Sequence, residues 1–199
     1  MFNGIIYNQG RIISIKKNPK YVSGSLVVEI SSNIKFKKSD IGESVCCDGV
    51  CLTLIRIKNK SFLFYLSKET LKRSNFRFIK IGNIINIEKS LTYGQKISGH
   101  FVQGHVDSTA IVKDISFIDK SWLLKLSLEN KRLYNSLVEK ASISINGVSL
   151  TISKIAKNHF EVNIIPHTLK LTNLKNLKTK HIVNIELDIF SKYISKFSK

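Results

Sequence analysis

The sequence predicts an all-β protein made of two similar small domains, followed by a short C-terminal helix. Residues 48–53 (DGVCLT) and 146–151 (NGVSLT) repeat at an offset of 98 in a chain of 199 residues. Two further pairs of segments keep this offset, and short apolar runs alternate with turn residues through both halves. Ordered matches at one offset indicate a duplicated domain, and each copy is long enough to build its own core.

The further matches define the extent of the repeat. Residues 66–75 (LSKETLKRSN) align with 164–173 (IIPHTLKLTN), and residues 84–88 (IINIE) align with 182–186 (IVNIE). No linker rich in Pro or Ser separates the halves, so we expect two closely joined domains. We assign residues 1–97 to the first repeat, 98–187 to the second, and 188–199 to the terminal helix.

Most of the predicted secondary-structure elements are β-strands. Short runs rich in Val, Ile, Leu, Phe and Ser, with turn residues between them, are typical of a small barrel or sandwich. The Asp48-Gly49 and Asn146-Gly147 pairs predict two-residue hairpin turns, because these residues accept positive φ angles. The predicted strands are residues 25–30, 51–57, 62–66, 84–88, 122–128, 149–155 and 160–165.

Helices are fewer. Residues 67–74 and 133–140 predict single short helices, and Pro166 fixes the approach to the equivalent turn in the second repeat. The C-terminal stretch DIFSKYISKFSK predicts a helix with one apolar face, formed by Ile189, Phe190, Tyr193, Ile194 and Phe197. So short a helix needs a partner for that face, which is either its own domain or another subunit.

Composition narrows the class of protein. The formal charge of +18 suggests a polyanion partner, but the lysines are dispersed among many Ile, Asn and Phe residues. Codons for these residues are rich in A and T, so we prefer a solvated lysine-rich surface to a nucleic-acid interface. We expect no membrane span and no signal peptide, and therefore a cytoplasmic globular protein.

Three cysteines, Cys46, Cys47 and Cys51, lie within six residues. An odd number in one short stretch does not form a disulfide framework, and adjacent cysteines pair poorly. A zinc site would need a fourth ligand and a wider first spacing. We therefore expect reduced thiols, of which at most one is functional, and no metal site.

Each repeat carries two small polar residues directly after its hairpin turn. These are Cys51 and Thr53 in the first repeat and Ser149 and Thr151 in the second. Residues at i and i+2 of a strand share a face, so each copy presents a pair of hydroxyl or thiol groups to one side. Such pairs suit close approach of a flat ring, although ordinary packing at a barrel mouth is the alternative.

Residues 98–107 (SGHFVQGHVD) contain two histidines, two glycines and an acid. Gly104 removes side-chain bulk, and His105 can exchange a proton near neutral pH, so a binding loop is a plausible interpretation beside a purely structural histidine. Aligning Gly4 with Gly104 places the first residues of the chain, MFNGII, opposite this loop. Asp188 follows a predicted strand, where it either caps the terminal helix or orients a partner or substrate hydroxyl.

The combined motifs carry a resemblance over nearly the whole chain. In order and spacing, MFNGII, DGVCLT, LSKETL, SGHFVQGHVD, INGVSLT, IPHTL and VNIELD resemble the duplicated, lumazine-binding riboflavin synthase family. The resemblance implies two six-stranded antiparallel Greek-key barrels, a C-terminal helix and a homotrimer assembled through those helices. It also implies an active site shared between subunits and an association with lumazine synthase.

The implied reaction is a dismutation that needs no metal or organic cofactor. Two molecules of 6,7-dimethyl-8-ribityllumazine exchange a four-carbon unit, giving riboflavin and 5-amino-6-(D-ribitylamino)uracil. The C7 methyl group of the lumazine is acidic because its carbanion delocalises into the ring, so the protein mainly has to hold two rings and move protons. A duplicated domain fits a reaction between two copies of one molecule.

The same resemblance assigns residues to two sites. His105 is the first choice for proton transfer, Cys51 or Ser44 would assist addition at the ring carbon, and Ser149, Thr151 and Asp188 would serve the second barrel. Glu69 aligns with His167, so the two sites cannot make identical contacts. The implied substrate-binding residues are Gly4, Ile5, Ile6, Cys51, Leu52, Thr53, Tyr65, Leu66, Ser67, Lys68, Glu69, Thr70, Gly104, His105, Val106, Lys140, Ser149, Leu150, Thr151, Asn163, Ile164, Ile165, Pro166, His167 and Thr168.

Two alternatives stay open at this point. One is a lumazine-binding or flavin-binding protein of the same fold that binds without turnover. The other is a basic small-barrel protein that binds nucleic acid, with exposed aromatic residues on a lysine-lined face. Polar motif residues in both repeats favour the enzyme.

Overall fold

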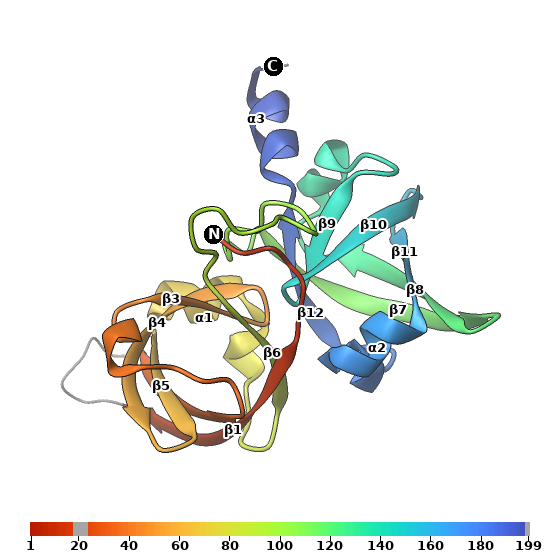
Figure 1. The fold of residues 1–199 in the computed structure, drawn as a ribbon. Helices are drawn as coiled ribbons and strands as arrows, with labels where there is room; N and C mark the ends of the chain where they lie inside the picture. Colours follow the sequence, from red (N-terminus) through yellow and green to blue (C-terminus); the bar gives the residue numbers. More distant parts are fainter. Residues whose placement is uncertain (18–23, 198–199) are drawn as a thin grey trace.

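The computed structural model describes residues 1–17 and 24–197 and contains two closed antiparallel barrels (Figure 1). Around the first barrel the strand order is β1-β2-β5-β4-β3-β6, and the second repeats this order as β7-β8-β11-β10-β9-β12. The predicted fold class is therefore confirmed. The first barrel comprises β1 (Asn8–Lys17), β2 (Leu26–Ser32), β3 (Ser44–Cys47), β4 (Val50–Lys58), β5 (Ser61–Leu66) and β6 (Ile84–Lys89). The second comprises β7 (Ser108–Ile118), β8 (Ser121–Leu128), β9 (Ser142–Ile145), β10 (Val148–Ile155), β11 (Phe160–Ile164) and β12 (Ile182–Leu187).

Buried and exposed side chains alternate along the strands, so one face of each strand points to the core and the other to the surface. In β4, Leu52 and Leu54 are buried whereas Thr53 and Ile55 are exposed. The inward side chains of each barrel form one continuous apolar cluster. Irregular pairing recurs at matching places in both barrels, between Leu54 and Arg56 of β4 and between Ile152 and Lys154 of β10. Such bulges bend a strand and help a sheet to close.

Both predicted hairpin turns are present. Asp48 and Gly49 have φ angles of 47° and 79°, and Asn146 and Gly147 have 47° and 78°, as a primed turn requires. The two turns meet between the barrels, where a Cβ atom built on Gly49 would lie 2.8 Å from the backbone nitrogen of Gly147. Only glycine allows this approach of backbone to backbone.

A buried asparagine network joins the barrels around these turns. The Asn86 side chain donates to the Asn146 carbonyl at 2.9 Å, and its equivalent Asn184 donates to the Asp48 carbonyl at 2.7 Å. Asn173 donates through its backbone N–H to the Asn86 side chain at 2.7 Å. These reciprocal hydrogen bonds satisfy polar groups that would be costly to bury alone.

The short helices differ partly from the prediction. Helix α1 (Lys68–Arg73) begins after Ser67, whose side chain accepts the Thr70 N–H, and α2 (Pro166–Leu171) has proline in its first turn. The predicted helix over residues 133–140 is wrong. The structure has a 3-10 helix, η3 (Lys131–Ser136), which ends because Leu137 turns to an extended conformation and buries its side chain. Further 3-10 helices are η1 (Lys38–Asp40), η2 (Asn75–Phe78) and η4 (Asn173–Asn176).

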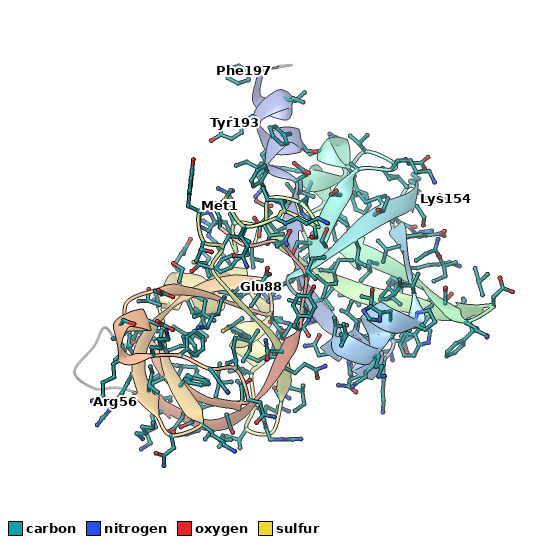
Figure 2. The ribbon with its side chains drawn as sticks, in the orientation of Figure 1. Met1, Arg56, Glu88, Lys154, Tyr193 and Phe197 are labelled. Carbon is teal, nitrogen blue, oxygen red and sulfur yellow. The ribbon has the colours of Figure 1, made fainter. Side chains whose placement is uncertain are left out.

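The terminal helix α3 (Ile189–Phe197) projects away from both barrels (Figure 1). Asp188 accepts the Phe190 N–H at 2.9 Å, which is the predicted capping contact. Phe190, Tyr193 and Phe197 are 62%, 59% and 83% exposed, and Figure 2 shows Tyr193 and Phe197 extending into solvent. Residues 198–199 of the predicted helical segment lie outside the described residues. Within the described ranges, no helix has the length and apolar content that crossing a membrane requires.

Candidate functional site

The β3–β4 hairpin presents a polar face outside the core of the first barrel. Ser44 is paired with Thr53, and Cys46 with Cys51, so all four side chains share this face. Cys46 is buried, Cys51 is half-buried and Thr53 is exposed. The predicted pairing of Cys51 and Thr53 on one side of the strand is confirmed.

The β9–β10 hairpin repeats this face with hydroxyl groups. Ser142 is paired with Thr151, and Ser144 with Ser149. Ser149 is half-buried and Thr151 is exposed, as in the first barrel. The main chemical difference is that the two thiols of Cys46 and Cys51 are replaced by the hydroxyls of Ser144 and Ser149.

Residues 2–6 and 102–106, here called the leading segments, cross between the barrels. Gly4 accepts the Ser149 N–H at 2.8 Å, and Gly104 accepts the Cys51 N–H at 2.8 Å. Ile6 belongs to the apolar cluster of the second barrel, whereas Val106 packs against that of the first. Each polar face is therefore bordered by the segment that leads into the other barrel.

The glycines of the leading segments allow this close crossing. Gly4 and Gly104 have φ angles of 72° and 78°, which other residues rarely adopt. A Cβ atom on Gly4 would lie 2.7 Å from the Ser149 Cβ, and one on Gly104 would lie 2.7 Å from the Cys51 Cβ. The alignment of Gly4 with Gly104 proposed from the sequence is confirmed by this shared geometry.

Two glutamates, the half-buried Glu88 and the buried Glu186, hold the leading segments. Glu88 accepts backbone N–H groups of Asn3 at 2.7 Å and Gly4 at 3.0 Å, and it lies between the barrels (Figure 2). Glu186 accepts those of Gln103 at 2.7 Å and Gly104 at 2.9 Å. Burial raises the pKa of each carboxyl group to about 7, although these hydrogen bonds act in the opposite direction.

His100 is a site residue that the sequence prediction missed. Its Nδ1 lies 2.7 Å from the Ser149 hydroxyl oxygen, and its side chain is buried. Burial lowers the pKa of His100, and the charge of Asp188 acts in the opposite direction. Its Nε2 and the Ser144 hydroxyl are buried without a hydrogen-bond partner among the described residues.

His105 occupies a different environment from His100. Its side chain is exposed, and its backbone N–H donates to Glu186 at 3.2 Å. Because residues 104 and 106 contact the first barrel, His105 lies beside the Cys51 face rather than inside the protein. Its proposed role in proton transfer stays a prediction.

Beside each polar face, two neighbouring strands of the barrel stop pairing before one of them ends. This unpaired stretch is called the seam of that barrel. Pairing of β4 with β5 ends at Leu54 and Phe64, although β5 continues to Leu66 against β2. Pairing of β10 with β11 likewise ends at Ile152 and Val162, although β11 continues to Ile164 against β8. The seams separate the predicted binding segments, residues 51–53 from 65–70 and residues 149–151 from 163–168.

The remaining predicted residues lie around these seams. Lys140 donates its backbone N–H to Ile152 at 2.8 Å, directly after Thr151. Glu69 is exposed and forms an ion pair with Arg73, whereas His167 is exposed in the first turn of α2. The two seams therefore carry different side chains at this equivalent position, and the expected difference in their ligand contacts stays a prediction.

The three cysteines are free thiols. Burial raises the pKa of Cys46 and Cys47 well above the usual range for a thiol. Cys51 is the accessible thiol of the group, so it is the one suited to contact a ligand. Cys47 belongs to the core of the first barrel.

Fold and site together define a duplicated small-barrel protein with one candidate binding face on each barrel. The chain belongs to the lumazine-binding domain family, whose model matches residues 3–90 and again residues 103–188. It is similar to the riboflavin synthase of Buchnera aphidicola subsp. Schizaphis graminum, with 37% identity over the whole chain and 94% of the relative. It is 32% identical to the riboflavin synthase of Escherichia coli (strain K12), over 94% of this chain and 87% of that one.

A solved structure has the same fold with a bound ligand. LumP complexed with 6,7-dimethyl-8-(1'-D-ribityl) lumazine superposes with a TM-score of 0.78 and 25% identity. The match covers 94% of this chain and 98% of LumP. A protein solved with a bound lumazine therefore shares this architecture.

Proposed function

We propose that this protein is a riboflavin synthase. It would convert two 6,7-dimethyl-8-ribityllumazine molecules into riboflavin and 5-amino-6-(D-ribitylamino)uracil, with no oxidant or reductant. The main support for the proposal is that each barrel has a similar polar face. Each face is bordered by the leading segment of the other barrel. A reaction between two copies of one molecule needs two similar sites, and relatives named riboflavin synthase match the full chain.

The role of the protein in this reaction is to position and to move protons. Holding two rings together replaces a bimolecular encounter, which lowers the barrier substantially. In the first site His105 would exchange the C7 methyl proton, and Ser44 or Cys51 would assist addition at the ring carbon. In the second site Ser149, Thr151 and Asp188 would hold the other ring, with backbone groups of the seams binding the pyrimidine edge.

We further propose a cytoplasmic homotrimer with active sites shared between subunits. The exposed aromatic side chains of α3 support this assembly, because Phe190, Tyr193 and Phe197 leave an apolar face uncovered in the single chain. A trimer could bring the first barrel of one subunit to the second barrel of another. Association with lumazine synthase would supply the substrate directly.

A mixing experiment tests the shared site. His105→Ala would inactivate the first site and Ser149→Ala the second, so each variant alone should have low activity. Subunits mixed after mild dissociation should regain activity, because some interfaces then combine two intact faces. No recovery in verified mixed trimers would contradict sharing between subunits.

The non-catalytic alternative is distinguished by turnover. Purified protein incubated with the lumazine should produce riboflavin, followed by its visible absorbance. Saturable binding without riboflavin would assign the chain to the ligand carriers of the family instead. Retention of a polar face on both barrels favours the enzyme.

A further inference from the structure

A cavity of about 490 Å³ lies between the two barrels and shares no lining residue with the candidate sites. Many of its lining residues are equivalent pairs of the two repeats, so it follows the local twofold relation between the barrels. Polar residues of the asparagine network line it together with apolar side chains. The equivalent pairs are Asp48 with Asn146, Asn75 with Asn173, Phe78 with Asn176, Ile79 with Leu177, Gly82 with Lys180, Asn83 with His181, and Ile84 with Ile182.

Asp48 has one carboxyl oxygen that the protein does not use. Its Oδ1 accepts the Asn86 N–H at 2.7 Å and the Asn173 side-chain N–H at 2.9 Å. Its Oδ2 has no hydrogen-bond partner among the described residues, although the side chain is only 5% exposed. A nearly buried carboxyl oxygen without a partner is costly unless something else binds it.

Asn146 has a matching unused donor. Its Oδ1 accepts the Asn184 N–H at 2.8 Å, which fixes the orientation of the amide and leaves Nδ2 as the other atom. Nδ2 has no partner among the described residues, and Asn146 is 3% exposed. Asn86 contacts both residues, because its side chain also donates to the Asn146 carbonyl.

Both unused atoms are accessible. The polar atoms that are sealed and unpartnered in the described structure are His100 Nε2, Ser144 Oγ and Ser153 Oγ. Asp48 Oδ2 and Asn146 Nδ2 are unpartnered without being sealed. The cavity that both residues line is the open space available to them.

We propose that this cavity binds a planar heterocycle with a cyclic amide edge, meaning a ring carbonyl beside a ring N–H. Asn146 Nδ2 donates to the carbonyl, and Asp48 Oδ2 accepts the N–H. Phe76, Ile79 and Leu177 supply apolar walls for the ring. The volume lies within the range of small-molecule sites, and this site is separate from the proposed riboflavin synthase sites.

The difference between Asp48 in the first repeat and Asn146 in the second sets the ligand specificity of the cavity. Two asparagines would present two donors, whereas an ionised aspartate and an asparagine present one acceptor and one donor. An amide edge is complementary to the second arrangement only. The one acidic member of the network is therefore the residue that selects the ligand.

Binding should depend on pH in a defined direction. Burial raises the pKa of Asp48 to about 8, so the empty cavity holds a protonated carboxyl group at neutral pH. A ligand N–H needs the ionised form, so affinity should rise about tenfold per pH unit until about pH 8 and then level. Lys180 and His181 also line the cavity, and the Cys47 thiol is adjacent. A variant at Asp48 separates its contribution from theirs.

The test uses uracil, which has the amide edge, and 1,3-dimethyluracil, which lacks the N–H. Uracil should bind the wild-type protein, Asp48→Asn should weaken it at least tenfold, and dimethyluracil should not bind. Asp48→Asn copies the residue of the second repeat, so its Oδ1 can still accept both protein hydrogen bonds. Diffraction from crystals soaked with 5-iodouracil should place iodine in the cavity between the barrels.

Three results would overturn the proposal. They are equal uracil affinity in the wild type and Asp48→Asn, tight binding of dimethyluracil, and iodine found only at the barrel seams. If Asp48→Asn fails to fold, the pH dependence of uracil binding by the wild-type protein decides instead. An affinity that is flat between pH 6 and 8 contradicts a role for Asp48. Because riboflavin formation is a separate readout, failure here leaves the proposed function unaffected.

Discussion

The buried His100 places its Nδ1 2.7 Å from the hydroxyl oxygen of the half-buried Ser149, beside the second polar face. A neutral imidazole fixes the direction of a hydroxyl group, so His100 acts as a positioning residue for Ser149. Its other ring nitrogen is buried without a partner among the described residues. The pair therefore links the stretch just before the leading segment 102–106 to the chemistry proposed for the second barrel.

His100→Ala should lower riboflavin formation about tenfold or more, because the Ser149 hydroxyl loses its orienting partner. Ser149→Ala should have a similar effect, and the double variant should lose little more than either single variant. Steady-state turnover of the three variants checks this coupling. Additive losses would show that the two side chains act independently.

His105→Ala should lower turnover more than tenfold without affecting stability, since its side chain is exposed. His159→Ala is a suitable control, since His159 lies in the loop before β11. Unchanged turnover in His105→Ala would remove this residue from the proposed mechanism.

Gly104→Ala should destabilise the protein by about 1–2 kcal/mol from backbone strain alone, with a further cost from the clash with Cys51. Gly94→Ala is the matched control, since Gly94 also has a positive φ of 81° but nothing lies within 4 Å of the place that a Cβ atom would take. Denaturant unfolding measures both. Equal losses of stability would mean that the close crossing contributes nothing.

Asp48→Asn should change how stability depends on pH. Burial gives Asp48 a pKa of about 8 in the folded protein, above the ordinary aspartate value of 3.8, so the folded state binds its proton more tightly. The free energy of unfolding of the wild type should therefore fall by about 1.4 kcal/mol per pH unit between about pH 4 and 8, relative to the variant. Unfolding curves at several pH values measure the difference in free energy of unfolding between the wild type and the variant. This difference would not change with pH if the folded protein did not raise the pKa of Asp48.

Replacing Phe190 and Tyr193 by serine should convert the proposed trimer to monomers, because their exposed side chains supply the proposed contact. Ile81→Ser is the control, since Ile81 is 65% exposed but precedes β6 in the first barrel. Sedimentation velocity distinguishes the species. A trimer that persists in the double variant would place the subunit interface elsewhere.

The sequence predicted the features that depend on local pattern. The turns at Asp48 and Asn146 and the alternation of Cys51 with Thr53 need only neighbouring residues to be recognised. By contrast, β3 and β9 are four residues each, too short to show periodicity. The assignment of residues 1–97 and 98–187 to separate repeats stays a prediction.

The crossing of the leading segments could not be seen in the repeat alone. Strict use of the offset of 98 pairs His100 with Phe2, whereas the glycines align at an offset of 100. The pairing of Phe2 with Val102 in the structure follows the glycine alignment. The contact of His100 with Ser149 depends on that crossing, which is why His100 was missed while His105 was selected.

In the proposed reaction, two similar sites hold two copies of one substrate while a four-carbon unit passes from one copy to the other. The most direct measurement is the product balance when purified protein is incubated with 6,7-dimethyl-8-ribityllumazine alone. Two lumazines consumed should give one riboflavin and one 5-amino-6-(D-ribitylamino)uracil. Stoichiometric lumazine binding with no riboflavin formed would contradict the claim.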